Sequence, residues 1–124
     1  MPIPILKQRD VLIVSIQSAP TDPDLLQLKD DLADRVGRHR SRGVVIDVSA
    51  LDVMDSFAAR TLRMISRTTK LRGAETVIVG IQPEVAFSMT QLGLTLQDVS
   101  TALDLEEGLE LLATVMKKDP QGGG

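Results

Sequence analysis

Residues 47–62, with the sequence DVSALDVMDSFAARTL, join the two patterns that decide the fold class. Their first two residues end a nearly continuous β-branched run at residues 44–48, which is typical of a strand buried on both faces of a parallel sheet. They lead into a segment with helical periodicity, which we predict to run from Ser56 to Leu71. The buried stripe predicted for this helix consists of Ala58, Leu62, Ile65 and Thr69. A strand, a short loop and a helix in this order are typical of an α/β domain.

The N-terminal residues predict a β-hairpin. Residues 3–8 and 11–16 are rich in β-forming side chains and are separated by a two-residue turn. Pro2 and Pro4 cannot donate hydrogen bonds to a neighbouring strand, which favours an edge position for the first strand. We therefore expect the sheet to begin with an antiparallel pair at one of its edges.

Start signals and apolar periodicity predict three further helices and two further strands. Thr21 caps one helix, Pro83 opens a short one, and Asp104 caps the last one. Residues 76–81 and 99–102 are expected to be strands. The apolar stripes of the three helices are Leu25, Leu28, Leu32 and Val36, then Val85, Met89 and Leu92, and finally Leu105, Leu109, Leu112 and Met116.

This alternation predicts one α/β domain at residues 1–118 and a flexible tail at residues 119–124. The sheet should be mixed and mostly parallel, with about four to five strands including the N-terminal hairpin, and about four helices should pack on it. Loops at the carboxyl ends of parallel strands are where ligands and partners usually bind. The loops at residues 47–55 and 80–84 should be neighbours at that rim.

The composition excludes several classes of function. The chain has 124 residues, a net charge of −3 and 2% aromatic residues, so it lacks the positive surface and the stacking platforms that nucleic acids need. It has no cysteine, which excludes disulfides and thiolate metal sites. Its apolar runs are about as long as strands and its N-terminus does not resemble a signal peptide, so we expect a cytoplasmic protein that does not enter a membrane.

The sequence lacks the usual motifs of catalytic sites. It has no glycine-rich phosphate loop followed by lysine, no histidine pair at metal-ligand spacing and no glycine-flanked nucleophilic serine. The single histidine, His39, lies at the polar end of the first helix, where a surface role beside the helix C-terminus is expected. We therefore expect no enzymatic activity, no cofactor and no metal.

Three carboxylates, Asp47, Asp52 and Asp55, allow two interpretations. They could form a magnesium site, as in a receiver domain that is phosphorylated on aspartate, but such a site also needs a lysine near the end of a later strand. That strand ends at residues 79–82 without a lysine. In the structural alternative, Asp55 caps the second helix while Asp47 and Asp52 accept hydrogen bonds from loop amides.

Ser56 also allows two interpretations. It could simply cap the second helix or occupy its first turn. Alternatively, its hydroxyl is a phosphorylation site, because a helix N-terminus accepts a phosphate without unfolding. The added charge beside Asp52 and Asp55 would then expel a docked partner by repulsion. Met54 and Phe57, if partly exposed, would supply apolar contact area for that partner, although the core is the alternative place for Phe57.

These residues resemble the STAS domain of anti-anti-sigma factors, in which a hydrophobic strand ends in aspartate and a short loop leads to Asp-Ser at the head of a helix. The resemblance covers nearly the whole chain and is specific for RsbS-type stressosome scaffold proteins. Its segments are PILK at residues 4–7, LIVSIQ at 12–17, VVIDVSALDVMDSF at 44–57, VGIQPEVA at 79–86, LG at 92–93 and TALDLEEGLE at 101–110.

The resemblance implies a non-enzymatic antagonist that sequesters an RsbT-like serine/threonine switch kinase and releases it when Ser56 is phosphorylated. The implied partner surface includes Gln82 and Glu84. The resemblance also implies RsbR-like co-antagonists, self-association as a homodimer within a large hetero-oligomer, and an RsbX-like phosphatase. Ser88 matches a second phosphorylated position of the co-antagonists, which RsbS-type proteins are not known to use. The alternative is a STAS module that binds a nucleotide or another small ligand at residues 52–56.

Overall fold

The computed structural model describes residues 3–17, 19–96 and 99–118, and within them the chain forms one mixed sheet. The strand order is β1-β2-β3-β4-β5, so β1 is an edge strand as predicted. The first two strands form an antiparallel hairpin, and each later strand pairs in parallel with the one before it. The strands are β1 (Ile5–Gln8), β2 (Val11–Ser15), β3 (Gly43–Asp47), β4 (Glu75–Val79) and β5 (Ser100–Ala102).

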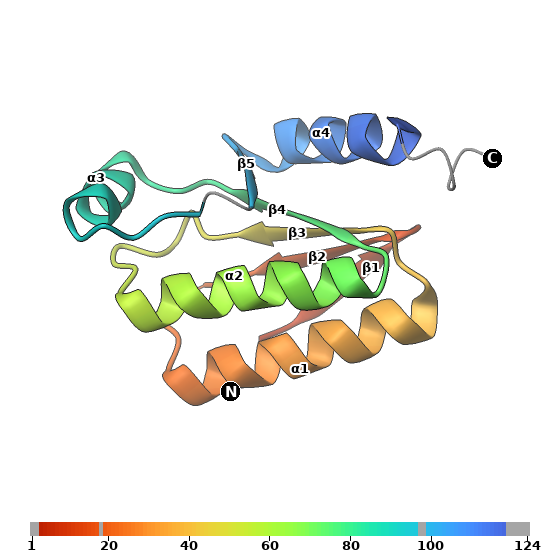
Figure 1. Ribbon diagram of the computed structural model, residues 1–124, viewed down its shortest axis with the longest axis horizontal. Helices are drawn as coiled ribbons and strands as arrows, with labels where there is room; N and C mark the ends of the chain where they lie inside the picture. The colour runs from red at the N-terminus through yellow and green to blue at the C-terminus, as the bar shows by residue number, and fades with distance from the viewer. Residues whose placement is uncertain (1–2, 18, 97–98, 119–124) are drawn as a thin grey trace.

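Helices lie on both faces of this sheet (Figure 1). Two of them, α1 and α2, cover one face side by side, and α4 lies on the other face (Figure 1). The short α3 lies beyond the end of the sheet, at the same end of the molecule as the start of α2 (Figure 1). Their bounds are α1 (Asp22–His39), α2 (Ser56–Leu71), α3 (Pro83–Gln91) and α4 (Leu105–Lys118). The predicted fold class is confirmed; the predicted tail at residues 119–124 lies outside the described residues.

Side-chain caps begin three of the helices where the sequence places them. Thr21 and Asp24 form a capping box, in which each side chain accepts a hydrogen bond from the backbone N–H of the other. Asp55 accepts a hydrogen bond from the N–H of Ala58 at the start of α2. Asp104 accepts one from the N–H of Glu107 at the start of α4. These bonds satisfy backbone donors that have no acceptor within the helix.

The sheet separates two apolar clusters. The larger one lies between the sheet and the helices α1 and α2, where Leu28, Ile46 and Leu62 are at most 1% exposed. The smaller one lies under α4 and consists of Val45, Val77, Val79 and Leu112. Because residues alternate between the two faces of a strand, β3 and β4 need apolar side chains at successive positions. This is the physical reason for the continuous β-branched run in the sequence.

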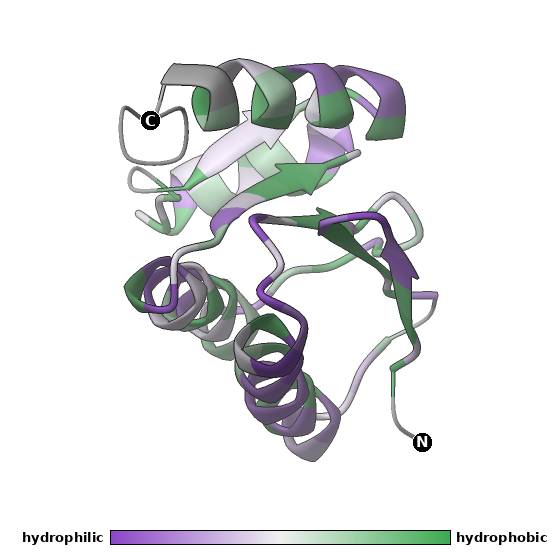
Figure 2. Ribbon diagram, turned by 90° about the vertical axis from the view of Figure 1, so that its right-hand side faces the viewer, coloured by the Kyte–Doolittle hydropathy of each residue, from purple (hydrophilic) through white to green (hydrophobic). Residues whose placement is uncertain are grey.

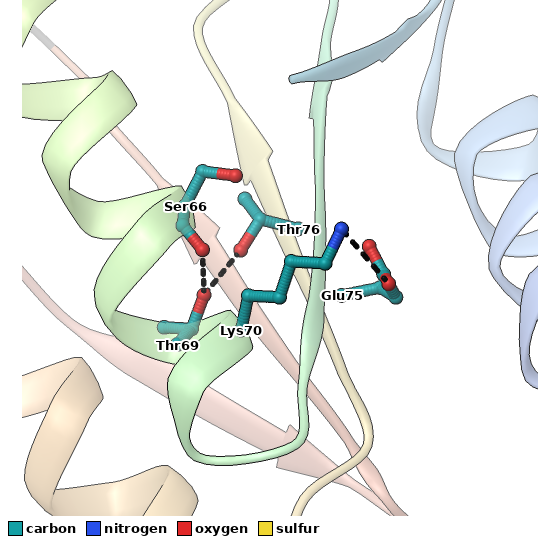
Figure 3. A network of polar contacts seen from close by, with 5 residues as sticks. All are labelled: Ser66, Thr69, Lys70, Glu75 and Thr76. Carbon is teal, nitrogen blue, oxygen red and sulfur yellow. Dashed lines mark hydrogen bonds and ion pairs between the residues drawn. The ribbon is translucent and has the colours of Figure 1, made fainter. Parts of the chain in front are cut away.

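A polar contact fixes the C-terminal end of α2 to β4 (Figure 3). The hydroxyl oxygens of Thr69 and Thr76 are 2.7 Å apart, and both side chains are buried. The Thr69 hydroxyl also donates to the carbonyls of Ile65 and Ser66, at 3.0 and 3.1 Å. Since that hydroxyl has a single proton, Thr76 is the donor between the two threonines. Nearby, Lys70 and Glu75 form an exposed ion pair at 3.9 Å.

Two residues of the predicted apolar stripes are exposed, which corrects those predictions. Leu92 is 67% exposed because α3 ends at Gln91 and the chain turns at Gly93, where φ is +71°. Leu94 packs against the core instead. Leu105 is 38% exposed because it is the first residue of α4, which contacts the sheet through Gly108 and Leu112 further along.

Candidate functional site

The rim is formed by the loop between β3 and α2 together with the loop between β4 and α3. The two loops approach closely at Gly80, whose φ of +80° favours glycine. A Cβ atom at Gly80 would lie 2.9 Å from Cβ of Ser49, so a larger residue would push the loops apart. The predicted neighbourhood of these two loops is therefore confirmed.

The side chain of Gln82 connects the two loops. Its Nε2 donates to the carbonyl of Ser49 at 2.8 Å and to Oδ1 of Asp52 at 3.3 Å. Gln82 occupies the N-cap position of α3 but makes no capping hydrogen bond there. Its side-chain amide therefore links the two loops of the rim and does not cap α3. The sequence placed Gln82 at this edge, but nothing in it indicated this contact.

The carboxylates of the rim have separate structural roles. Asp47 accepts a hydrogen bond from the N–H of Ser49 at 2.9 Å, and Asp55 accepts from the N–H of Ala58 at 2.8 Å. Asp52 accepts from the side chain of Gln82, where the structural alternative expected a loop amide. Within residues 3–17, 19–96 and 99–118, no group of three or more histidine, aspartate or glutamate side chains is placed to hold a metal ion.

Ser56 is exposed at the first position of α2. Asp55 is the N-cap residue, and its side chain makes the capping hydrogen bond, so Ser56 is not the cap. In the described part of the chain, the Ser56 hydroxyl has no hydrogen-bond partner. Another small residue at position 56 should therefore preserve the local fold.

Met54 does not lie on the surface of the rim, which corrects the expectation that it offers contact area. It is only 4% exposed and packs in the larger cluster together with Leu51. Phe57 is partly buried against the same cluster. The loop belongs to no strand or helix, so these buried side chains are what anchor it to the core. Met54 therefore cannot contact a partner unless the loop rearranges.

Two exposed apolar side chains at this end are ones that the sequence did not single out. Val53 is 76% exposed in the loop before α2, and Phe87 is 66% exposed on α3. The predicted residues Glu84 and Ser88 are also exposed on α3. Helical spacing places Phe87 away from the buried pair Val85 and Met89, so this spacing could have identified it. For Val53 the sequence offers no such signal.

A shallow cavity of about 320 Å³ lies beside α3. Its lining is formed by apolar and threonine side chains, among them Ile81, Met89, Leu94 and Thr101. Among the residues that the structure describes, no charged side chain lines it. It therefore offers no electrostatic counterpart for the phosphate groups of a nucleotide.

Comparison with known proteins identifies the fold family. Residues 3–108 match the STAS domain model. A serine-to-glutamate variant of RsbS from Moorella thermoacetica has a similar structure, with a TM-score of 0.80, 39% identity, and coverage of 93% of this chain and 97% of that protein. A structure of the stressosome, described as a signal integration and transduction hub, contains a chain with a TM-score of 0.74 and 38% identity over 92% of this chain and 99% of that one.

The chain is also similar to a longer regulator of Bacillus subtilis (strain 168). The RsbT co-antagonist protein RsbRA is 32% identical over 84 residues, which are 68% of this chain but only 31% of RsbRA. In the described part of the present structure, no helix has the length and apolar character required to cross a membrane. The match of the domain model and the likeness to RsbS over nearly its full length lead to one conclusion: this chain belongs to the STAS domain family, as an RsbS-type relative of stressosome components.

Proposed function

We propose that this protein is a non-enzymatic stressosome scaffold that sequesters an RsbT-like kinase and releases it when Ser56 is phosphorylated. The observation that carries the proposal is the position of Ser56, exposed at the first residue of α2 and relieved of capping by Asp55. The likeness to RsbS over nearly the whole chain supports it. The proposed location is the cytoplasm, where RsbR-like co-antagonists would join the assembly and an RsbX-like phosphatase would reset the serine.

The start of α2 suits a phosphate group. The N–H groups of Ser56 and Phe57 belong to the first helical turn and have no acceptor within the helix. The positive end of the helix dipole lies at the same place, and both features favour an anion. Arg60 is exposed one turn further along α2, at the spacing that allows an ion pair with residue 56. A phosphate on Ser56 would therefore be accepted without unfolding the helix.

The same phosphate would disfavour a docked kinase. It adds about −1.5 to −2 charges at neutral pH. Asp52 and Asp55 already make this edge acidic, and Glu84 is exposed on α3 beyond it. Val53 and Phe87 would supply apolar contact area for the kinase. A partner that fits the rim before phosphorylation would be disfavoured, because docking would bury the added charge next to Asp52 and Asp55.

Intact-mass spectrometry tests the proposal. The protein is incubated with an RsbT-like kinase, magnesium and ATP, in parallel with three variants. We expect one phosphate on the unmodified protein and none on Ser56→Ala. The matched control is Ser49→Ala, which removes another exposed serine of the same loop and should still gain the phosphate. Ser88→Ala should behave like the control. Phosphorylation of Ser56→Ala, or none on the unmodified protein, would contradict the proposal.

A further inference from the structure

The end of the molecule opposite the rim carries many basic side chains. The helices α1, α2 and α4 end there, and β3 and β4 begin there (Figure 1). Figure 2 shows this end facing the viewer. Its basic side chains come from the β1–β2 turn, from the connection between α1 and β3, and from the end of α2 with the connection to β4. We call these residues the basic end; they are Arg9, Arg40, Arg42, Lys70 and Arg72.

Backbone hydrogen bonds hold the three connections side by side. The carbonyl of Asp10 accepts from the N–H groups of Arg42, at 2.7 Å, and of Gly43, at 3.2 Å. The carbonyl of Arg42 accepts from the N–H of Glu75 at 3.0 Å. The connection between α1 and β3 is therefore joined to the connection on each side of it. Basic residues that are far apart in the sequence thus lie on one surface.

The side chain of Arg72 extends from the end of α2 onto α1. A Cβ atom at Gly37 would lie 2.8 Å from Nη1 of Arg72, so the guanidinium group lies against the bare backbone of α1. Gly37 is one turn before Arg40, the C-cap residue of that helix. Both arginines are exposed, and the side chain of neither forms a hydrogen bond or an ion pair with another described residue. Two neighbouring helix ends therefore present guanidinium donors without acceptors.

Two arginines of the basic end occupy backbone positions that favour glycine. The φ angle is +56° at Arg9 and +52° at Arg40, in the left-handed region that is disfavoured for a residue with a Cβ atom. The helix dipole explains a cation at Arg40 but not at Arg9, which belongs to no helix. The exposed side chain of Arg9 also has no hydrogen bond or ion pair with the other residues that the structure describes. A binding partner accounts for an arginine that the turn itself does not need.

A hollow of about 370 Å³ opens at the same end, between the ends of α2 and α4. Its lining includes Arg42 and Lys70 as well as the apolar side chains of Val115 and Met116. Nη2 of Arg42 donates to the carbonyl of Met116 at 3.2 Å, which ties α4 to the connection before β3. Leu71, which follows Lys70 in the sequence, is 89% exposed. The basic end therefore combines cations with accessible apolar surface.

We propose that the basic end binds an acidic segment of another protein. The carboxylates of that segment pair with Arg9, Arg40 and Arg72, and one of its apolar side chains enters the hollow. Arginine suits carboxylates because its planar group donates two parallel hydrogen bonds. The three arginines come from separate connections, so they match several carboxylates along a chain and not one compact phosphate group. Arginines together with apolar side chains are typical of protein–protein interfaces.

Other anionic partners fit this surface less well. The chain has two aromatic residues, Phe57 at the start of α2 and Phe87 on α3, so neither provides a stacking surface for nucleic-acid bases at the basic end. The acidic rim of a second copy lies at the opposite end of the molecule. A contact between rim and basic end would therefore propagate into a filament and not into a closed assembly.

This inference goes beyond the proposed function and does not rest on it. The basic end contains no residue of the rim, and binding there requires neither the kinase nor a phosphate on Ser56. The phosphorylation experiment and the binding experiment can therefore fail independently of each other.

Fluorescence anisotropy with a labelled synthetic peptide tests the proposal. The peptide has leucines interspersed among glutamates, and a second peptide has glutamine in place of every glutamate. We expect saturable binding of the acidic peptide, and at least about tenfold weaker binding of the glutamine peptide. The double variant Arg40→Asn with Arg72→Gln should raise the dissociation constant of the acidic peptide about tenfold. Asparagine tolerates the left-handed backbone at residue 40, so this variant should keep its fold, which thermal unfolding checks.

The matched control is Lys29→Gln combined with Arg63→Gln. It removes the same charge from the middle of the same two helices and should leave the dissociation constant unchanged. Equal weakening in the two double variants, equal binding of the two peptides, or no saturable binding would overturn the proposal. So would tighter binding of duplex DNA or of phosphatidylserine vesicles through the same two arginines. Sedimentation velocity would overturn it if the chain self-assembled and the double variant at Arg40 and Arg72 abolished that assembly, because the occupant would then be a second copy.

Discussion

The rim and the α4 side of the sheet differ in what holds their side chains. At the rim, Gln82, Asp47 and Asp55 are held by hydrogen bonds, and the hydroxyl of Ser56 is exposed and makes no capping bond. On the α4 side, Val45, Val77, Val79 and Leu112 are held by apolar packing. A phosphate changes the charge of a surface but not the apolar area of a distant one. A charge added at Ser56 should therefore leave the packing of α4 unchanged.

The largest expected effect is a loss of stability when the packing of α4 on the sheet is disrupted, away from the rim. In Gly108→Val, the first added carbon would lie 2.6 Å from Cγ1 of Val79, so α4 must move away from the sheet. We expect the free energy of unfolding to fall by about 3 kcal/mol, measured by urea denaturation. Ala113→Val enlarges an exposed residue of the same helix and should change it by less than about 0.5 kcal/mol. Equal stability of the two variants would show that α4 does not need this close approach.

The second prediction damages only the rim. Ser56→Asp should lower the affinity for an RsbT-like kinase at least about tenfold, because it adds a charge beside Asp52 and Asp55. Ser56→Ala should retain the affinity and prevent release in the presence of ATP. Isothermal titration with the kinase would contradict the switch if the two variants bound it equally well.

The third prediction loosens the rim without changing its charge. Gln82→Ala removes the amide that joins Ser49 and Asp52 to the second loop, and should lower the free energy of unfolding by about 1 kcal/mol. Amide hydrogen exchange should become faster in the loop at residues 48–55. Gln91→Ala, at the exposed end of α3, should have neither effect. Unchanged exchange in Gln82→Ala would mean that Leu51 and Met54 hold the loop by themselves.

The smallest expected effect concerns the capping box at the start of α1, which lies outside both regions. The N–H of Thr21 donates to the carboxylate of Asp24, and this hydrogen bond lowers the pKa of that carboxyl from its usual value. A lowered pKa stabilises the fold above the usual value, about 4, and this contribution is lost as the pH falls through the folded pKa. The stability difference between the unmodified chain and Asp24→Asn should therefore shrink in acid, as thermal unfolding can measure. A difference that grows in acid would have the wrong sign. Asp24→Asn should not affect kinase binding.

Regular elements of this protein were predictable from the sequence because they follow from local chemistry. The bounds of α2 and the buried stripe of Ala58, Leu62, Ile65 and Thr69 agree with the prediction. The caps Thr21, Asp55 and Asp104 also act where they were expected. A repeating spacing determines which side of a helix faces a core, and a capping side chain acts on amides only three residues away. Neither requires knowledge of distant parts of the chain.

The position of Ser56 at the head of a helix was likewise determined by the sequence alone, together with the family to which that motif points. Only the tertiary structure decided that Met54 is buried while Val53 is exposed and that Gln82 bridges two loops. It also decided that, among the described residues, no helix covers β1 and β2 on the α4 side of the sheet. Loops have no periodicity, so burial there depends on which remote segments pack against them. An uncovered face is a property of the arrangement of layers, and no single segment of sequence contains it.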